Sequence, residues 1–581
     1  MKKWIKKKRS RRISLLMAVF MVTSTILPIL PTGKYAFAAL NEPGEVTYET
    51  TQDYQHHIYA NGQPLLIVAS EKNINYAKLF IDSNKNGVGE SDEEITSFQG
   101  DGTLNGGGIY YSEEQGGYFL TNSSIYGGAK DGTCTYDTNI TLTGATDTSN
   151  DYTVWALYGG NQNGTLIGDT YVHISGGSIL WAFGGNRAGE IDGNTYIDMD
   201  GGHMVNKMYG GNCVGQIHGN TNIDIESAVV SSVFGGNEES GIVEGNTALT
   251  FGENTIANGW IYGGGAGYDN SVISEVMGST TITINGGLFN HNIYGGGGWR
   301  GATVGSSNII INDGTFNGCW IYGGGEEQSS VTGKATITLN NGYVPTIVGT
   351  GAAFNNYDGE TTIAEVGEAE IHLKGGSVDH VYSQMNENTI LHRDFSFEAV
   401  GDTFSNTYLY FGQNNTNNLQ NVSITLKDTN VALLHISDII ENTLSITFDN
   451  ASVLTPTNFQ MKQDVLKNAK ESTLSYLNCG SKEGRWGVFQ EANFNISGND
   501  NPVLIGYYLN HNQFTNVIFK DSYVNYYDFT LVDDDNGPQS CAQTLTIDGG
   551  ALRVIGFMIT QMPKTIFQNN PILIRTTHGT P

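Results

Sequence analysis

Cysteine, proline and basic residues are scarce in this chain. Its 581 residues include 5 cysteines and 11 prolines, and 29 Lys and Arg stand against 58 Asp and Glu. No cysteine belongs to a C-x-x-C pair, so neither a disulfide framework nor standard zinc spacing defines the fold, and buried small apolar thiols are expected. The low proline content excludes a Pro-rich tract, and the acidic surface disfavours nucleic acid or anionic lipid as partners.

Long apolar runs are also missing beyond the N-terminus. Eight Lys and Arg within residues 1–12 precede a largely apolar stretch at 13–30, and Ala36-Phe37-Ala38 supplies a cleavage site. This pattern predicts a secretory signal peptide over residues 1–38, in preference to an uncleaved membrane anchor. Its removal leaves 20 basic and 58 acidic side chains, a net charge of −38. We therefore expect a secreted or cell-surface monomer with no transmembrane segment after cleavage.

What the chain has in excess is glycine, 76 residues, and a phrase that returns. An aromatic residue followed by Gly-Gly recurs at steps of 25 to 32 residues. Such a period marks a solenoid, in which each repeat packs only on its neighbours. The phrase is therefore expected to be structural. The aromatic residues are Tyr126, Tyr158, Phe183, Tyr209, Phe234, Tyr262, Tyr294 and Tyr322.

Alternating apolar and polar residues precede most copies of the phrase. Residues 171–177, 196–202 and 281–287 show the pattern, and each run ends in Asn, Asp, Ser or Gly. Alternation is typical of a half-buried strand, and those residues favour tight turns. A second short strand ends at the aromatic, and a third follows Gly-Gly, centred on Ile191 or Ile217. Three strands in roughly 25–30 residues predict one coil of a parallel β-helix.

One local motif predicts calcium binding. Residues 82–93 match the D-x-[DN]-x-[DN]-G-x5-E loop, because hard oxygen ligands alternate with a glycine at the sharp turn. The preceding residues 77–81 look like a strand, so this is an EF-hand-like loop outside a helix–loop–helix setting, holding a structural ion with weak affinity. The alternative is an Asn/Gly-rich hairpin beside a solvated acidic patch. The predicted ligands are Asp82, Asn84, Asn86, the Val88 carbonyl, Glu90 and Glu93.

Outward positions of the alternating strand carry the candidate catalytic residues. Asp198 and Asp224 are expected on adjacent coils, about 5 Å apart at the backbone, as a carboxylate pair for acid/base chemistry. Without Lys or Arg beside them, solvated surface carboxylates are the preferred interpretation, and His173 and His372 are expected to be isolated. Two Thr-x-Thr pairs are too few for an ice-binding ladder. The outward pairs are Tyr171/His173, Tyr196/Asp198, Asn222/Asp224, Ala248/Thr250, Thr281/Thr283, Asn308/Ile310, Thr336/Thr338 and Glu370/His372.

The predicted organisation has four parts. Residues 1–38 are the signal peptide, 39–120 an N-terminal β cap with the calcium loop, 121–390 the Gly-rich solenoid and 391–581 a degenerate continuation with insertions. Helical spacing of apolar residues also predicts one short helix over residues 458–470. The expected fold class is an all-β parallel β-helix of roughly ten or more coils.

The basic signal peptide, the loop over residues 79–87 and the Ile-Tyr-Gly-Gly-Gly units resemble secreted or surface adhesin-like proteins of Gram-positive bacteria. That resemblance covers residues 1–390 and implies a right-handed, pectin-lyase-like β-helix whose activity is unassigned. We expect a non-enzymatic binding or display protein directed toward glycans or a host or neighbouring cell surface. The alternatives are a polysaccharide lyase or glycoside hydrolase on the same scaffold, and a structural surface spacer.

Overall fold

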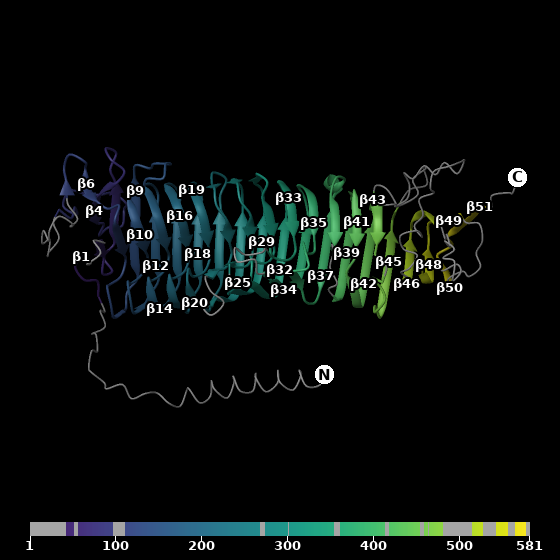
Figure 1. Ribbon diagram of the computed structural model, residues 1–581. Coiled ribbons are helices and arrows are strands. Elements are labelled where there is room, and N and C mark those ends of the chain that lie inside the picture. The colour runs from purple at the N-terminus through teal and green to yellow at the C-terminus, as the bar shows by residue number, and fades with distance from the viewer. Residues whose placement is uncertain are drawn as a thin grey trace, which may run out of the picture. The chain divides into compact units, whose positions relative to one another are not determined.

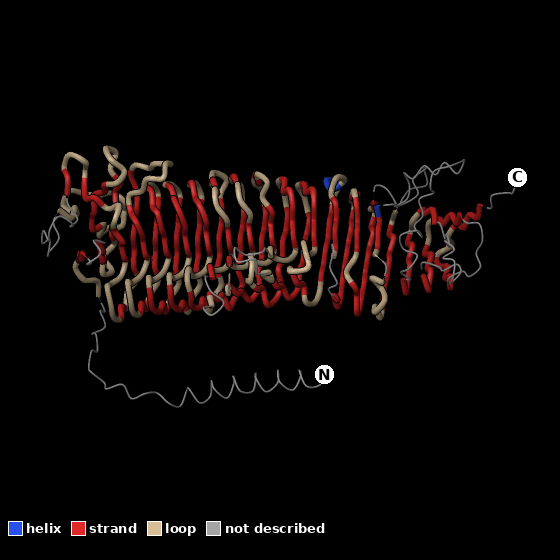
Figure 2. Tube along the Cα trace, viewed as in Figure 1, coloured by secondary structure: helices blue, strands red, loops and turns tan. Residues whose placement is uncertain are grey.

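The computed structural model describes residues 42–50, 56–96, 111–267, 273–299, 301–353, 361–412, 418–453, 458–462, 464–479, 514–526, 542–555 and 564–576. The predicted signal peptide lies outside these residues, as does Cys541. Within them, strands follow one another in stacked coils, and helix is confined to short 3-10 turns such as η1 (Asp402–Phe404) (Figures 1 and 2). The all-β parallel solenoid predicted from the repeat is confirmed.

The alternating runs form what we call the large sheet, to which the described residues contribute 26 strands. Its successive strands pair in parallel, each with its equivalent one coil away, as in β15 with β18. The ladder contains β9 (Thr138–Gly144), β12 (Thr170–Ile174), β15 (Thr195–Met199), β18 (Thr221–Ile225), β21 (Thr247–Phe251), β25 (Ser274–Ile284), β29 (Ala302–Ile311), β32 (Ser330–Leu339), β34 (Ala364–Leu373), β37 (Phe395–Val400), β39 (Asn418–Lys427), β42 (Ile439–Asp449), β45 (Glu471–Leu477), β46 (Phe514–Lys520), β48 (Ala542–Asp548) and β50 (Lys564–Gln568).

The third strand of each coil joins the same sheet. It is separate in the early coils, and from β25 onward it is continuous with the alternating strand across a register shift between Val276 and Ser279. The separate strands are β8 (Thr133–Cys134), β11 (Thr165–Ile167), β14 (Ala188–Asp192), β17 (Val214–Ile217) and β20 (Ser240–Val243), and β36 (Thr389–Leu391) occupies the equivalent place later.

The strands that end at the repeated aromatic form the aromatic sheet, to which the described residues contribute 18 strands. Its main ladder contains β2 (His56–Tyr59), β7 (Ser123–Tyr126), β10 (Val154–Tyr158), β13 (Ser178–Phe183), β16 (His203–Tyr209), β19 (Val229–Phe234), β23 (Ile261–Tyr262), β27 (Ile293–Tyr294), β31 (Trp320–Tyr322), β33 (Tyr343–Val348), β35 (Ser377–Tyr382), β38 (Tyr408–Phe411), β41 (Leu433–Ile436) and β44 (Phe459–Met461), with β22 (Ile256–Ala257), β26 (Leu288–Phe289) and β30 (Thr315–Phe316) beside it.

The first coil is closed by antiparallel pairs. β1 (Thr47–Thr50) pairs with β2, and β4 (Tyr76–Ile81) pairs with β3 (Leu65–Ala69) and β6 (Gly117–Phe119), which also pairs with β5 (Tyr111–Ser112). Smaller parallel sheets join β24 (Ala266–Gly267) to β28 (Gly298–Trp299), β40 (Asn430–Val431) to β43 (Ser452–Val453), and β47 (Tyr523–Tyr526) to β49 (Ala551–Ile555) and β51 (Ile572–Thr576).

Inside the coils, the Gly-Gly-Asn turn is held by a ladder of buried asparagines. The Oδ1 of Asn186 accepts the backbone N–H of Asn161 at 2.7 Å, and its Nδ2 donates to the carbonyl of Glu190 at 2.9 Å. A Cβ on Gly185 would lie 2.1 Å from the Oδ1 of Asn212, which explains the glycine. Buried polar backbone groups are costly unless paired, so this ladder satisfies the turn.

The helix predicted over residues 458–470 is wrong. Phe459–Met461 forms β44, and the chain then turns, with Asp464 at φ +72°, a conformation that no α-helix contains. Met461 and Val465 are both buried in the core. The helix-like spacing of Met461 and Val465 therefore comes from a strand followed by a turn, both of which place an apolar side chain in the core.

The cysteines within the described residues are free thiols. Cys134, Cys319 and Cys479 are buried and Cys213 is half-buried. Stacking of coils, with its cross-coil hydrogen bonds and apolar core, holds this part of the chain together in place of disulfides.

Candidate functional site

Asp198 and Asp224 occupy the positions that the alternation predicted. They are register partners in β15 and β18, both on the outer side of the large sheet. Burial raises the pKa of Asp224, and the charges of Asp198 and Glu226 raise it further. A carboxyl with a raised pKa beside a second carboxylate is one arrangement that acid/base catalysis requires.

His173 is not isolated, contrary to the sequence-based expectation. Its Nδ1 lies 3.1 Å from the Oδ2 of Asp198, and its Nε2 lies 3.8 Å from the Oδ1 of Asp200. The reason is register: β12 pairs with β15 so that His173 stands opposite Asp198, 25 residues later in the chain. The Asp198–Asp224 pair therefore has an imidazole beside it.

His372 is not isolated either, because it lies between two carboxylates. Its Nε2 is 3.1 Å from Glu370 and its Nδ1 is 3.1 Å from Glu398 on the next coil. The Nζ of Lys334 lies 3.0 Å from Glu370. Burial would raise the pKa of Glu370, but hydrogen bonding and the charges of Lys334 and His372 outweigh it and lower that pKa.

An open groove of about 390 Å³ runs beside this cluster of charged side chains and is lined by Lys334 and Glu370. Buried Phe395 and Val422 lie under it, and hydroxyl and amide side chains such as Ser396, Ser423 and Asn421 line it. Because both ring nitrogens of His372 are engaged by carboxylates, the imidazole has no nitrogen left to move a substrate proton. The cluster is better suited to holding neighbouring coils together.

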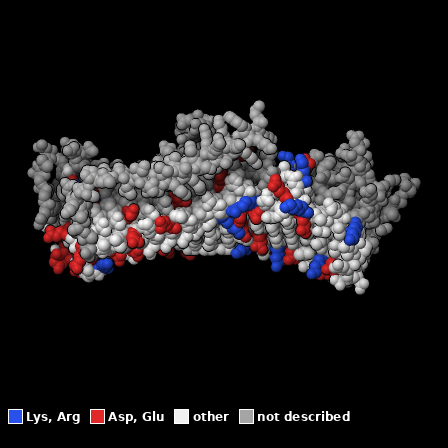
Figure 3. Space-filling model, turned by 90° about the horizontal axis from the view of Figure 1, so that it is seen from below, with Lys and Arg blue, Asp and Glu red and all other residues white. Residues whose placement is uncertain are grey.

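Figure 3 shows one face of the molecule. Asp and Glu predominate over the N-terminal coils in that view, and Lys and Arg gather among them only toward the C-terminal coils. Two ion pairs join basic and acidic side chains of neighbouring coils: Arg393 with Glu368 at 3.3 Å, and Lys334 with Glu370. The predominance of Asp and Glu over the N-terminal coils does not favour a polyanionic ligand there.

The repeated aromatic residues stack into a continuous ladder on the aromatic sheet. Tyr158 and Phe183 have ring centroids 4.5 Å apart, and Tyr262 and Tyr294 have centroids 4.9 Å apart, with interplanar angles of 7° in both pairs. These rings are buried, and they belong to a hydrophobic cluster separate from the main core. The ladder therefore lies on the outer side of the aromatic sheet and is covered by other side chains.

Tryptophan gathers over this ladder. Trp181, Trp260 and Trp320 each lie two residues before a ladder aromatic, in a set of register positions that we call the outer row. Trp155 and Trp299 lie beside the row, so five of the seven tryptophans are here. Trp155 is 39% exposed and Trp260 41% exposed. The outer row runs Trp181, Lys207, Ser232, Trp260, Asn292, Trp320 and Thr346.

Polar groups are interspersed among these rings. The Nζ of Lys207 lies 4.2 Å from the ring centroid of Trp299, within cation–π range. Glu326 accepts hydrogen bonds from the hydroxyls of Tyr262 and Tyr294. Burial raises the pKa of Glu326. Sequence reasoning missed this surface, although a Trp two residues before aromatic-Gly-Gly at positions 181, 260 and 320 was a readable signal.

The ladder is interrupted at one rung. Val348 takes the place of the aromatic between Tyr322 and Tyr382, which are its register partners on either side. Stacking resumes beyond it, with Tyr382 and Tyr410 5.2 Å apart. A cavity of about 340 Å³ lies at this break, lined by Asn292, Gly318, Trp320, Tyr322, Ala352, Ala353, Met385 and Asn386.

The predicted calcium loop follows β4, a strand, as expected. The buried Asp82 accepts the N–H groups of Asn86 and Gly87 through its two carboxylate oxygens, at 3.0 and 2.9 Å. Gly87 has φ +71°, and Glu93 reaches back to accept the N–H of Ser83 at 3.0 Å. The second oxygen of Glu93, Oε2, is buried without a hydrogen-bond partner.

The predicted ligands fit a divalent cation, because the buried Oε2 of Glu93 has no hydrogen-bond partner. An orphaned buried carboxylate oxygen in the loop that also holds the Asp82 carboxylate is a costly arrangement that a hard cation would relieve. Asn84 and Asn86 turn their Oδ1 atoms into the loop, where they accept N–H groups at 2.9 and 2.7 Å. Glu90 lies at hydrogen-bonding distance from Asn86, 3.5 Å.

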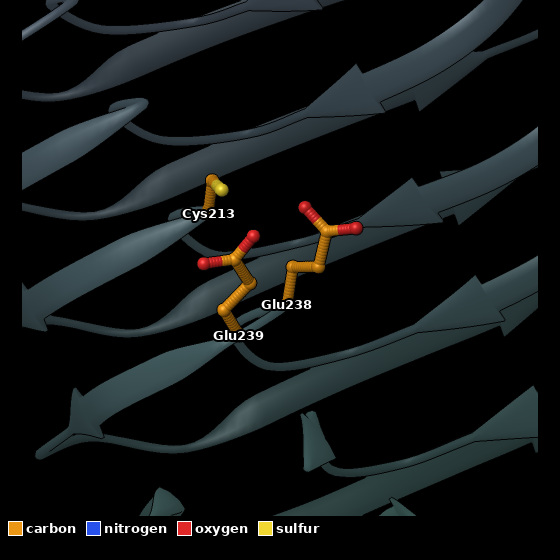
Figure 4. A group of neighbouring side chains, drawn as sticks. All are labelled: Cys213, Glu238 and Glu239. Carbon is orange, nitrogen blue, oxygen red and sulfur yellow. The ribbon is translucent and has the colours of Figure 1, made fainter. Parts of the chain in front are cut away.

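A second group of potential metal ligands lies near the ladder. Cys213 of one coil and Glu238 and Glu239 of the next project toward one another (Figure 4), with a donor atom of each within 4.8 Å of the others. Burial raises the pKa of the Cys213 thiol, and the two carboxylates raise it further. The thiol is hydrogen-bonded to Glu238. In the absence of a cation these residues hold a neutral thiol, not a thiolate nucleophile.

No protein-family model, curated protein or solved structure matches this chain. Among the described residues, none of the helical segments has the length and apolar character needed to span a bilayer.

Proposed function

We propose that this chain is a secreted or cell-surface β-solenoid that binds glycans and acts by binding and display, without catalysis. The observation that carries the proposal is the collection of five tryptophans around the outer row of the aromatic sheet. Tryptophan is the costliest apolar residue to leave in water, and its flat ring with one N–H donor suits surfaces that are partly apolar and partly wet.

The chemistry of the row supports a glycan in particular. Sugar rings present C–H faces that pack on aromatic rings and hydroxyls that need hydrogen-bonding partners. In the outer row, Lys207 and Ser232 lie between Trp181 and Trp260, and Asn292 lies between Trp260 and Trp320, one residue for each coil. A row with one residue for each coil suits a repeating polymer, because its positions follow one another at regular steps along the solenoid.

The proposal extends to location and family type. The predicted signal peptide and the Gly-rich repeat support a surface or secreted adhesin-like protein of a Gram-positive bacterium, with a glycan or a neighbouring cell surface as partner. The calcium loop would act as a structural cross-link between β4 and the following turn, without part in glycan binding.

Cleavage of a polysaccharide is the second candidate. It is favoured by the stacked carboxyl groups of Asp198 and Asp224, because the raised pKa of Asp224 would favour its role as a general acid. Against it stands the exposure of this pair on an open sheet face.

Glycan-array binding and calorimetry on residues 39–581 test the proposal. Wild type should bind at least one glycan class, and Trp181→Ala or Trp260→Ala should weaken that binding at least tenfold. Tyr171→Ala is the matched control, since Tyr171 is equally exposed, at 38%, but stacks on Tyr196 over the large sheet. Release of reducing or unsaturated sugar that Asp198→Ala or Asp224→Ala abolishes would defeat the binding proposal, and absence of any glycan ligand would favour a spacer.

A further inference from the structure

A cavity lies next to the break in the aromatic ladder, and Tyr322, the register partner of Val348, lines it. At seven successive steps, from Tyr126 to Tyr322, the rings stack with centroids 4.5 to 5.2 Å apart. At the next step Val348 offers no ring, although its own register position is unchanged. A valine at a position built for an aromatic leaves unfilled volume on the outer side of the sheet.

Small residues keep that volume open. Ala352 is the bridge partner of Glu326, so a methyl group stands in the coil where the preceding coil has a carboxylate side chain. Gly318 and Ala353 also line the space. The ladder therefore has a recess of about 340 Å³ at this place.

The lining has the character of a ligand site. Trp320 and Tyr322 contribute aromatic rings, 6.1 Å apart at 28°, and Met385 contributes an adaptable apolar wall. Asn292 and Asn386 also line the space; their Oδ1 atoms accept the N–H groups of Trp320 and Asn388, and each oxygen keeps a second lone pair. Sites for small ligands are concave, mostly apolar and aromatic, with a few polar groups that fix orientation, and they start at about 300 Å³.

We propose that this cavity binds one uncharged pyranose ring of the glycan, seated against Trp320, with the amides of Asn292 and Asn386 meeting its hydroxyls. The volume suits a single sugar unit and not a longer segment. The residues lining the cavity include no Lys, Arg, Asp or Glu, so a uronate or an amino sugar cation would find no counter-charge there. The inference rests on the proposed glycan-binding function and assigns its specificity to one place.

The cavity also differs from the rest of the outer row in what it can distinguish. Trp260 is exposed on a surface and can accept any sugar face, whereas the recess sets a ring against Trp320 among polar but uncharged side chains. The row would then supply affinity along the polymer and the cavity would choose which sugar is bound.

Calorimetry on residues 39–581 with a panel of neutral, uronate and amino-sugar oligosaccharides tests this assignment. Trp320→Ala removes the wall, and Val348→Tyr restores the missing rung and fills the space. Both should weaken binding of the neutral oligosaccharide at least tenfold. Trp260→Ala, which lies on the row outside the cavity, should weaken neutral and charged oligosaccharides by the same factor and leave the preference for neutral units unchanged. Circular dichroism confirms folding, and if Val348→Tyr does not fold, Trp320→Ala carries the test.

The outcomes separate the two proposals. Binding that Trp260→Ala weakens but Trp320→Ala and Val348→Tyr do not would overturn the cavity assignment and leave the glycan-binding function standing. Absence of binding by wild type to every oligosaccharide would overturn both. Binding of N-acetyl-tryptophanamide in the cavity, with no effect of either cavity variant on oligosaccharide affinity, would assign the space to an aromatic side chain and overturn the sugar assignment.

Discussion

Asp224 stands directly in register with Asp198 on the adjacent coil, and both carboxylates face the outer side of the large sheet. Like charges opposite one another on neighbouring strands destabilise a sheet by about 0.2–1 kcal/mol. Asp224→Asn should therefore raise the free energy of unfolding at pH 7 by about 0.5 kcal/mol, less at high salt. Chemical denaturation measures the difference.

The pH dependence of that effect follows from the raised pKa of Asp224. A carboxyl whose folded pKa lies above its unfolded value costs no stability below the unfolded value of 3.8, and the cost appears as pH rises through the folded pKa. The increase in unfolding free energy caused by Asp224→Asn should therefore vanish at low pH. Glu275→Gln is the control, because its register partners are Ile242 and Thr303. An equal gain in the control would contradict the explanation.

The asparagine ladder should be the most sensitive polar feature of the coil. Asn186→Ala removes the acceptor for the N–H of the buried Asn161 and the donor to the carbonyl of Glu190. A buried group without its partner costs about 1–3 kcal/mol, so a loss of about 3 kcal/mol is expected in urea denaturation. Asn254→Ala, at an exposed turn, should change stability by less than about 0.5 kcal/mol. Similar losses for both would argue against the ladder.

The sequence predicted the strands of each coil, but not which side chains of neighbouring coils contact one another. The recurrence of aromatic-Gly-Gly and the alternation in residues such as 281–284 determine which side chains face inward, because the period of a strand is two. The register partners of Asp198 and Thr281 were therefore correct. His173 and His372 were wrongly expected to be isolated, since their partners lie 25 and 26 residues away and enter only through side-chain reach.

The side of the aromatic sheet on which Tyr262 lies could not be read from spacing. An aromatic at a corner can fill the interior or cover the outside, and both choices keep the same sequence period. The structure places Tyr262 in a second apolar cluster, while its neighbour Ile261 points into the main core. The cavity beside Val348 depends on that outcome, and so it was beyond the reach of the sequence.

Asp438 should make the stability of the later coils depend on pH. Burial raises its pKa to about 7, although Gln384 donates a hydrogen bond to its Oδ1 at 2.9 Å and Lys462 contributes a lowering charge. The folded state therefore holds a proton that the unfolded state releases above its pKa of 3.8. Stability should be highest below that value and fall as pH rises to about 7, with no further loss above it.

The size of that fall can be measured with one substitution. A pKa displaced from 3.8 to about 7 corresponds to about 4 kcal/mol between the two limits. Asp438→Asn should remove most of this slope and raise the unfolding free energy at pH 8. Asp402→Asn, an exposed aspartate, should leave the slope unchanged. Equal slopes in wild type and Asp438→Asn would show that the carboxyl is not protonated in the folded chain.

Calcium should bind the loop of residues 82–93 weakly and stabilise the first coils. Asp82 already holds two backbone N–H groups, and Glu93 leaves one buried oxygen unpaired, so an ion would complete the shell with little rearrangement. With few carboxylate ligands, a Kd of about 10⁻⁴–10⁻³ M is expected, in the range of extracellular modules. Calorimetry on residues 39–581 should show this binding, and thermal unfolding should shift upward with calcium.

Two substitutions and one control decide whether the loop is responsible. Asp82→Ala and Glu93→Gln should each abolish the heat of binding and the calcium-dependent shift in unfolding temperature, because both remove a carboxylate oxygen from the shell. Glu113→Gln, an exposed acid outside the loop, should change neither quantity. Magnesium should fail to replace calcium, since it demands a smaller octahedral site and sheds water reluctantly. A calcium response that persists in Asp82→Ala would place the ion elsewhere in the chain and leave the unpaired oxygen of Glu93 without a partner.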